Sequence, residues 1–288
     1  MRDVNCETHP HLCTFDALPD HVRTQTFVGL RLGLGASIGL GEGFQVAVTL
    51  PIQLKAFTIA HALPDGTPYD TPYSLLTGPS EVEVGLGDTE VLVRMVRRVP
   101  GSPLLLQWGA GAALPTGRTS ANPFDPALPA SRRQQRQFGN GTVDPRVDLG
   151  VGVGTDPIGL LGSMSFRIPV YANRFGYTGQ RTVGGSLGVV VTPGAPIEKL
   201  RLMLAADASW ASPARWNDEP ALNSGGGMVG VRMGFEWAFK PQASLRGAFT
   251  VLPVQVMNGE QFLAPFVASI GLSGVIDVRP KKKDAHVH

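Results

Sequence analysis

The residues best suited to chemistry lie near the start of the chain, where two cysteines and two histidines form the pattern Cys6-x2-His9-x-His11-x-Cys13. Thiolate and imidazole groups are favoured ligands of Zn²⁺ and copper ions, so these side chains could hold a metal if the thiols stay reduced. Two cysteines this close together are also typical of a small disulfide loop in an oxidising compartment. We predict the Cys6–Cys13 disulfide and no cofactor, with the metal site as the alternative.

Short matches to catalytic and nucleotide-binding motifs lack the structural context that those motifs require. Residues 35–39 and 184–188 both fit G-x-S-x-G, but neither lies between a strand and a helix, and no histidine falls within a strand core. Residues 225–230 fit G-x-G-x-x-G, yet they lead into a strand instead of following one. The sequence therefore predicts no catalytic residue and no enzyme.

The elements that position the other polar residues show a two-residue alternation, which is clearest over residues 28–56. Aliphatic residues from Val28 to Ile38 alternate with small or polar ones, and the alternation resumes from Phe44 to Ala56 after a tight Gly-rich segment. This pattern predicts two strands of about 11 to 13 residues joined by a turn. Strands in soluble proteins are commonly about 5 to 6 residues long, whereas a tilted membrane strand needs about 9 to 11. The length favours a membrane.

The face opposite the aliphatic rows is charged, polar or glycine-rich, which is typical of the lumen of a transmembrane barrel and not of a dry sheet interface. The same parity along the later strands points thirteen ionisable side chains inward: Arg31, Lys55, Asp88, Glu90, Arg94, Arg146, Asp148, Arg167, Arg201, Asp207, Arg232, Glu236 and Arg246. We expect most of these lumen charges to pair, because an unpaired buried charge costs several kcal/mol. Their basic excess could also bias a residual pore toward anions.

The full pattern predicts an all-β fold, a transmembrane antiparallel up-and-down β-barrel over residues 23–278. An irregular N-terminal segment, 1–22, precedes it, and a polar tail, 279–288, follows it. Eleven strands can be identified, and short connections alternate with mostly longer ones, as periplasmic turns alternate with extracellular loops. Bacterial single-chain barrels have an even number of strands, so we expect about twelve, the last contributed by residues 1–22 or by chain upstream of Met1.

Two local features refine this prediction. The apolar parity changes between Val84 and Thr89, which predicts a bulge near residues 85–87. Aromatic residues near the predicted strand ends, such as Phe57, Trp210 and Trp237, are expected in the girdles at the membrane interfaces.

Composition limits the possible partners and the route to the membrane. The 288 residues include 36 Gly and 24 Pro, and the formal net charge is only +2 with the basic residues dispersed, so nucleic acid is not an expected partner. There is no run of 18 apolar residues, and hence no predicted transmembrane helix. An exported barrel needs a signal peptide, and residues 1–6 contain no apolar stretch, so either the numbering begins after its removal or the protein is not exported.

Several short motifs resemble the outer-membrane channel family associated with the meta-pathway of phenol degradation. They are Gly-Leu-Gly-Asp at 85–88 followed by Arg94, Ala-Leu-Pro-Thr-Gly at 113–117, Phe-Gly-Asn-Gly at 138–141, Asn-Ser-Gly-Gly at 223–226 and Asn-Gly-Glu-Gln at 258–261. The resemblance spans roughly residues 24 to 275. It implies a transporter-type β-barrel for small molecules, aromatic ones among them, without catalytic residues. The cysteine-containing N-terminus departs from the family pattern.

We therefore expect a Gram-negative outer-membrane protein, surrounded by lipid, that forms a narrow channel or transporter for small solutes, including hydrophobic or aromatic ones. A barrel of this size is largely filled by its own side chains, so porin-like bulk flow is not expected. The alternative is a structural barrel, or one that docks a protein partner through the N-terminal segment or the long loops. A lipid enzyme and a soluble barrel are two further alternatives.

Overall fold

The computed structural model describes residues 22–68, 81–119, 137–155, 157–194, 199–221, 224–240, 242–258 and 263–274. Within these ranges the chain is all-β: twelve strands form one large sheet and three short strands form a second. No helix in the described part is long and apolar enough to cross a membrane. The predicted antiparallel all-β fold of about twelve strands is confirmed. Cys6, His9, His11 and Cys13 lie outside the described residues, as does the tail 279–288.

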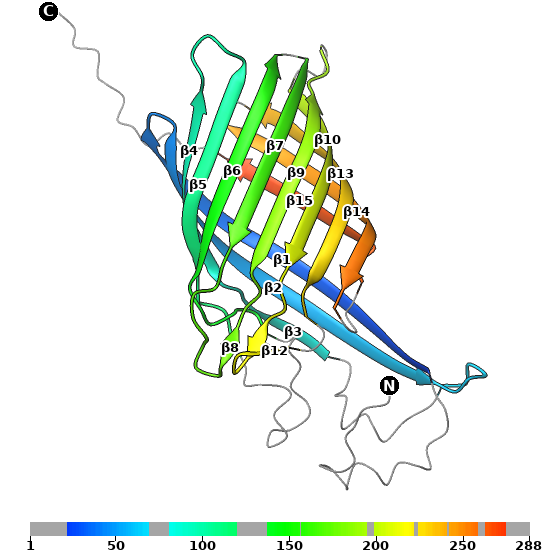
Figure 1. Cartoon of the computed structure of the whole chain (residues 1–288). Helices are drawn as coiled ribbons and strands as arrows, with labels where there is room; N and C mark the ends of the chain where they lie inside the picture. The colour runs from blue at the N-terminus through cyan, green and yellow to red at the C-terminus, as the bar shows by residue number, and fades with distance from the viewer. Residues whose placement is uncertain are drawn as a thin grey trace, which may run out of the picture.

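The strands of the large sheet follow one another in chain order along the path β1-β2-β4-β5-β6-β7-β9-β10-β13-β14-β15, and the sheet curls around a central axis (Figure 1). Every pairing along this path is antiparallel. The strands are β1 Val22–Gly41, β2 Phe44–Ala62, β4 Thr89–Arg98, β5 Leu104–Leu114, β6 Asp144–Thr155, β7 Ile158–Arg167, β9 Thr182–Val191, β10 Leu200–Ala211, β13 Gly226–Lys240, β14 Ala243–Met257 and β15 Phe266–Gly274.

The two ends of the sheet differ in the length of their connections. Only Glu42 and Gly43 separate β1 from β2, segments of two to five residues precede β5, β7 and β14, and one of eight precedes β10; we call this the turn end, at the top of Figure 1. The longer connections all lie at the opposite side, the loop end. This is the asymmetry predicted from the sequence, and it gives the barrel a defined direction.

β3 (Glu81–Leu86) lies off the path and continues the line of β4, because both strands pair with β2. Leu86 lies opposite Ile52 and Glu90 lies opposite Thr49. The β3–β4 side therefore has one residue more than β2 between these two pairs, which is a bulge. The break lies at residues 87–88, next to the predicted bulge, and it leaves Asp88 only 8% exposed.

The path contains eleven strands, and each is antiparallel to the next. β1 and β15 therefore run in the same direction, from the loop end to the turn end. No hydrogen-bonded pairing joins these two strands within the described ranges. An antiparallel closure of the sheet needs one more strand of opposite direction between them. The expected twelfth strand, from residues 1–22 or from chain upstream of Met1, stays a prediction.

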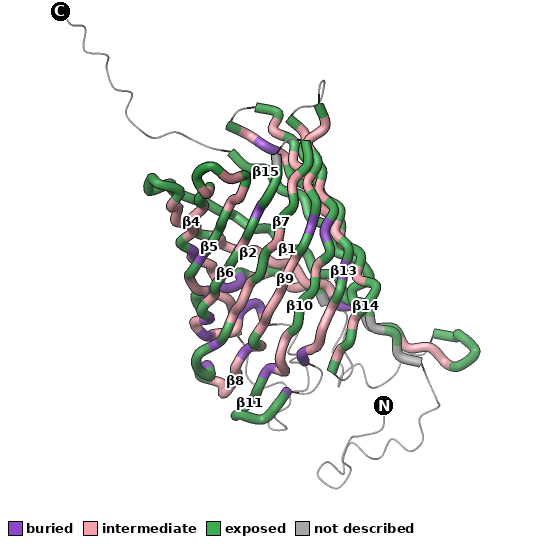
Figure 2. The backbone as a smooth tube through the Cα atoms, turned by 45° about the horizontal axis from the view of Figure 1, so that its top comes forward, coloured by how far each residue is buried: buried purple, intermediate pink, exposed green. Residues whose placement is uncertain are grey.

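The wall has its apolar side chains on the outside. Leu30 on β1 is 65% exposed and Leu204 on β10 is 56% exposed, whereas the carboxylate side chain of Asp144 on β6 is fully buried. Exposed and partly buried positions alternate along strands such as β13 (Figure 2). A protein surrounded by water rarely exposes such an extensive apolar surface. This distribution fits a wall that faces lipid.

The aromatic residues follow the predicted girdles only in part. Trp237 and Phe239 at the turn end are partly exposed, and their ring centroids lie 5.8 Å apart. The prediction is wrong for Phe57, which is 3% exposed. Phe57 shares the parity of the inward Lys55 and contacts the ring of Phe27, its cross-strand partner, with a centroid distance of 4.8 Å. Parity along the strand, and not closeness to a loop, determines which face an aromatic residue occupies.

The second sheet covers part of the loop end and was not predicted. Its strands are β8 (Tyr177–Thr178), β11 (Arg215–Trp216) and β12 (Glu219–Pro220), in the order β12-β11-β8. Tyr177, Ala214, Trp216 and Ala221 form a small apolar core, with Phe175 packed against it. Two-residue strands contain too few positions for an alternation to show in the sequence.

Candidate functional site: a charged lumen

The inner face of the sheet encloses a series of cavities. The turn-end cavity has a volume of about 920 Å³ and the loop-end cavity about 1190 Å³, and two smaller cavities of about 180 and 350 Å³ lie between them. The turn-end cavity and the first small one share Leu105, Gln107 and Met203. The two small cavities share Ser186 and Arg232. Neighbouring cavities therefore follow one another from the turn end to the middle of the barrel.

A buried charge cluster lies at the loop end. Arg167 donates two hydrogen bonds to Asp144 Oδ2, from Nε at 3.0 Å and from Nη2 at 2.7 Å, and Nη2 lies 3.9 Å from Asp88 Oδ2. The Asp144 side chain is fully buried, and that of Arg167 is 28% exposed. Asp144 was not among the predicted lumen residues because position 144 was assigned to the loop that precedes the strand. It has the same parity as Arg146 and Asp148, and extending the strand by two residues would have identified it.

The same carboxylates hold loop segments against the inner wall. The backbone N–H groups of Gly117 and Asn140 donate to Asp88, at 3.1 and 2.8 Å. The Asn140 amide and the Thr142 hydroxyl both donate to Asp144. We call residues 137–143 the lumen loop, since its residues Gln137, Phe138, Gly139 and Asn140 line the loop-end cavity.

Two polar side chains of β2 bind the start of the lumen loop. Lys55 donates to the carbonyl oxygen of Gln137, and its ammonium lies 5.0 Å from the ring centroid of Phe138. Gln53 donates to the Phe138 carbonyl oxygen at 3.3 Å. The loop is therefore fixed by side chains from several parts of the wall, and it occupies space that a wide pore would need.

Ion pairs continue through the middle of the lumen. Arg146 binds Glu90 at 3.0 Å and Asp148 at 2.8 Å, and Arg31 reaches the same Glu90 at 3.3 Å. Farther along the sheet, Arg232 binds Asp207 at 3.0 Å and donates to the Ser186 hydroxyl at 2.9 Å. These contacts join side chains from β1, β4 and β6 in one group and from β9, β10 and β13 in another.

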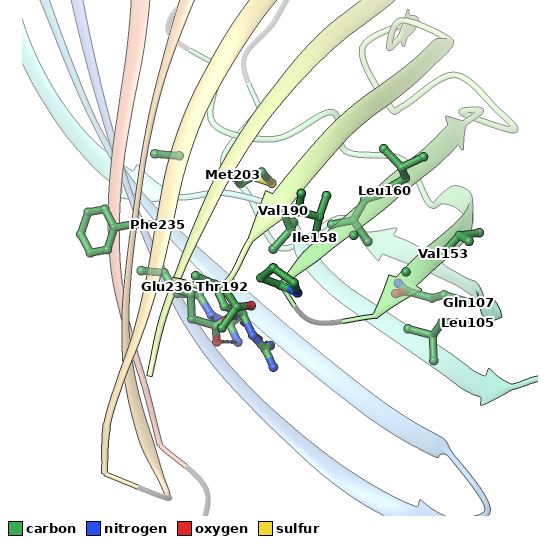
Figure 3. Close-up of a pocket in the computed structure, with 18 of the residues that line it drawn as sticks. Leu105, Gln107, Val153, Ile158, Leu160, Val190, Thr192, Met203, Phe235 and Glu236 are labelled. Carbon is green, nitrogen blue, oxygen red and sulfur yellow. Dashed lines mark hydrogen bonds and ion pairs between the residues drawn. The ribbon is translucent and has the colours of Figure 1, made fainter. Parts of the chain in front are cut away.

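The turn end holds a further group of charges on three adjacent strands. Arg246 donates to Glu236 Oε1 from Nε at 3.0 Å and from Nη2 at 2.8 Å, while Arg201 approaches Glu236 Oε2 at 4.0 Å. In Figure 3, Glu236 and Phe235 project to opposite sides of β13. Arg98, which was not predicted, also lines this cavity. Arg98 is four residues from Arg94 and shares its inward face, but the predicted strand ended at position 97.

The structure brings eleven of the thirteen predicted lumen charges into ion pairs with one another or with Asp144. Lys55 instead binds the lumen loop. Arg94 makes no ion pair with any described residue, and its buried Nε lacks a hydrogen-bond partner there. A pore of this kind can exclude, select or bind solutes by charge. The described residues contain no group of three His, Cys, Asp or Glu side chains that could hold a metal.

Comparisons with known proteins identify the architecture. No family model matches the sequence, and no curated protein is similar to it. Among solved structures, the chain is similar to the crystal structure of an outer membrane channel from Pseudomonas putida F1, with a TM-score of 0.54 and 10% identity, over 88% of this chain and 84% of that one. The chain shares the fold of that channel. A structure of the NanC porin gives a TM-score of 0.42 and 8% identity, over 86% of this chain and 99% of that one. The barrel fold implied by the sequence resemblance is confirmed, and the link to phenol degradation stays a prediction.

Proposed function

We propose that this protein is a Gram-negative outer-membrane β-barrel that forms a narrow channel for small solutes. The observation that supports this most directly is the distribution of side chains: aliphatic residues such as Leu30 and Leu204 face outward, and charged residues surround a series of internal cavities. Lipid stabilises such an outer wall, and a polar lumen provides a route across it. The similarity in fold to an outer membrane channel is consistent with this function.

The contents of the lumen favour selective passage over bulk flow. The smallest cavity, of about 180 Å³, is lined by Leu105, Leu161 and Met203 as well as by Ser163 and Arg232. The lumen loop takes up further space at the loop end. A solute must therefore be small, and it meets apolar and charged groups in the cavity of about 180 Å³. This supports passage of small molecules that have some apolar surface, as the sequence resemblance also implies.

Conductance of the purified protein in planar lipid bilayers tests the proposal. We expect the protein to need detergent for solubility, to migrate differently in electrophoresis before and after heating, and to give small, step-like currents. The same preparation unfolded by heat is the control and should give none. A protein that stays soluble without detergent, or a folded and inserted barrel without any current, would contradict the channel function; the second result would favour a structural or docking barrel.

A further inference from the structure

We propose that the turn-end cavity is a binding site for small organic anions with an apolar body, such as short carboxylates. This inference rests on the proposed channel function and names the class of solute that the channel favours.

The turn-end cavity has an excess of positive charge. Arg98, Arg201 and Arg246 line it together with a single carboxylate, that of Glu236. Arg201 and Arg246 share that carboxylate, and no described acidic side chain lies within ion-pair distance of Arg98. One carboxylate cannot neutralise three guanidinium groups, so the cavity can accept a further anion.

The loop-end cavity does not share this excess. Its charged lining residues are Arg31 and Arg167 with Asp88 and Glu90, which balance formally. The fully buried carboxylate of Asp144 lies directly behind Arg167. The lumen is therefore more positive at the turn end than at the loop end, and an anion that has entered the barrel is attracted toward the turn end.

The arginines of the turn-end cavity are available to a ligand. The side chains of Arg201 and Arg246 are 65% and 61% exposed, so their guanidinium groups do not have to leave a buried pair before they bind. A guanidinium group offers donors in a planar fork that matches a carboxylate. Of the two arginines that contact Glu236, Arg201 has the longer contact, at 4.0 Å against 2.8 Å for Arg246, so Arg201 can accept a second carboxylate.

Apolar side chains line other parts of the same cavity. Leu105, Leu161, Val190 and Met203 contribute to its lining, with Gln107 and Thr192 among them (Figure 3). Val190 on β9 and Met203 on β10 are cross-strand partners, and Met203 is two residues from Arg201 along the chain. A ligand that places its carboxylate on Arg201 can therefore lay a hydrocarbon chain against these side chains. Burial of that chain adds affinity that an inorganic anion cannot obtain.

Ion selectivity of the open channel is the first test. In a KCl gradient across a planar bilayer, we expect the wild-type reversal potential to show a preference for chloride. Removing or adding one charge about 6 Å from a hydrated ion changes its local concentration about threefold. Because chloride gains and potassium loses by this factor, Glu236→Gln should raise the chloride-to-potassium permeability ratio by about tenfold, and Arg98→Gln with Arg201→Gln should lower it by more. Arg215→Gln removes an equal charge from β11, outside the cavity lining, and should leave the ratio unchanged.

Binding of matched probes is the second test. Hexanoate, hexanamide and hexylammonium have the same apolar chain and differ in charge. We expect hexanoate to reduce the chloride current most and hexylammonium least, with the difference lost in the Arg98→Gln, Arg201→Gln double variant. Cation selectivity of the wild type, or equal effects of the three probes, would overturn the anion site while leaving the channel function intact.

The binding test also works without conductance. Saturation-transfer NMR on the detergent-solubilised barrel should detect hexanoate on the wild type and on Arg215→Gln, and not on the double variant. If no variant conducts, the proposed channel function fails, and this measurement still decides the anion site. Hexanoate binding that persists in the double variant would place the ligand elsewhere and overturn the inference.

Discussion

At the scale of single residues, burial distinguishes the ion pairs that stabilise the folded barrel from the exposed ion pairs that contribute little to its stability. Asp144 is fully buried and accepts two hydrogen bonds from Arg167. Arg201 is 65% exposed and only approaches its carboxylate partner. Breaking a buried pair leaves an uncompensated charge in a dry site, whereas an exposed pair exchanges its partner for water at little cost. The two sites should therefore respond very differently to the loss of one charge.

We predict that Asp144→Asn destabilises the folded barrel by about 3 kcal/mol, because Arg167 would keep only the distant carboxylate of Asp88, at 3.9 Å. Arg201→Gln should change the free energy of unfolding by about 1 kcal/mol or less. Urea unfolding of the folded protein in lipid vesicles, followed by tryptophan fluorescence, measures both. Equal losses for the two variants would show that the Asp144 pair has no special structural role.

At the scale of elements, the lumen loop depends on a close approach between two backbone segments and one carboxylate. A Cβ atom added at Gly139 would lie 2.1 Å from Asp88 Oδ1, and one added at Gly117 would lie 2.7 Å from the backbone of Gly139. Asp88 cannot simply swing aside, because it accepts hydrogen bonds from two backbone N–H groups. Glycine at position 139 therefore keeps the loop in place.

We predict that Gly139→Ala moves the lumen loop off the wall and raises the single-channel conductance in planar bilayers, because the loop no longer narrows the loop end. Gly39→Ala is the matched control, since a Cβ atom there meets nothing within 4 Å. Stability in vesicles should fall for Gly139→Ala by about 1 to 3 kcal/mol, as for other overpacked sites, and hardly at all for the control. An unchanged conductance for Gly139→Ala would mean that the loop does not limit the pore.

The sequence predicts the strands well and the loop contacts poorly, for a physical reason. Strand faces follow a period of two, so parity alone points Glu90, Arg146 and Glu236 inward. Arg98 was missed only because its predicted strand ended one residue too early, and Asp144 only because its predicted strand began two residues too late. The lumen loop could not be predicted, because its position rests on contacts between residues such as Asp88 and Asn140, which are 52 positions apart and follow no repeat. The same holds for the packing of Tyr177 on Trp216 in the small sheet.

At the scale of the whole molecule, the outer wall and the lumen reverse the usual distribution of polarity in soluble proteins. The core of such a protein is apolar, whereas the inner face of this sheet holds four groups of ion pairs. The aliphatic residues of β1, β6, β10 and β13 instead cover the outside. The proposed channel and the proposed anion site both depend on this arrangement, because each needs a lumen that stays hydrated while lipid covers the wall.

Two variants, one with a lysine on the outer face and one with a lysine on the inner face, test this arrangement. Leu204 faces outward near the middle of β10, and Ser163 on β7 lines two of the inner cavities. Lysine near the middle of a lipid-facing wall costs about 2 to 4 kcal/mol, and lysine in a hydrated lumen costs much less. Leu204→Lys should therefore lower the stability and yield of folding into vesicles, while Ser163→Lys should fold nearly as well as wild type. In a water-exposed wall the order would reverse, because Leu204→Lys would replace an exposed aliphatic side chain with a soluble one, and that result would contradict a membrane-spanning barrel.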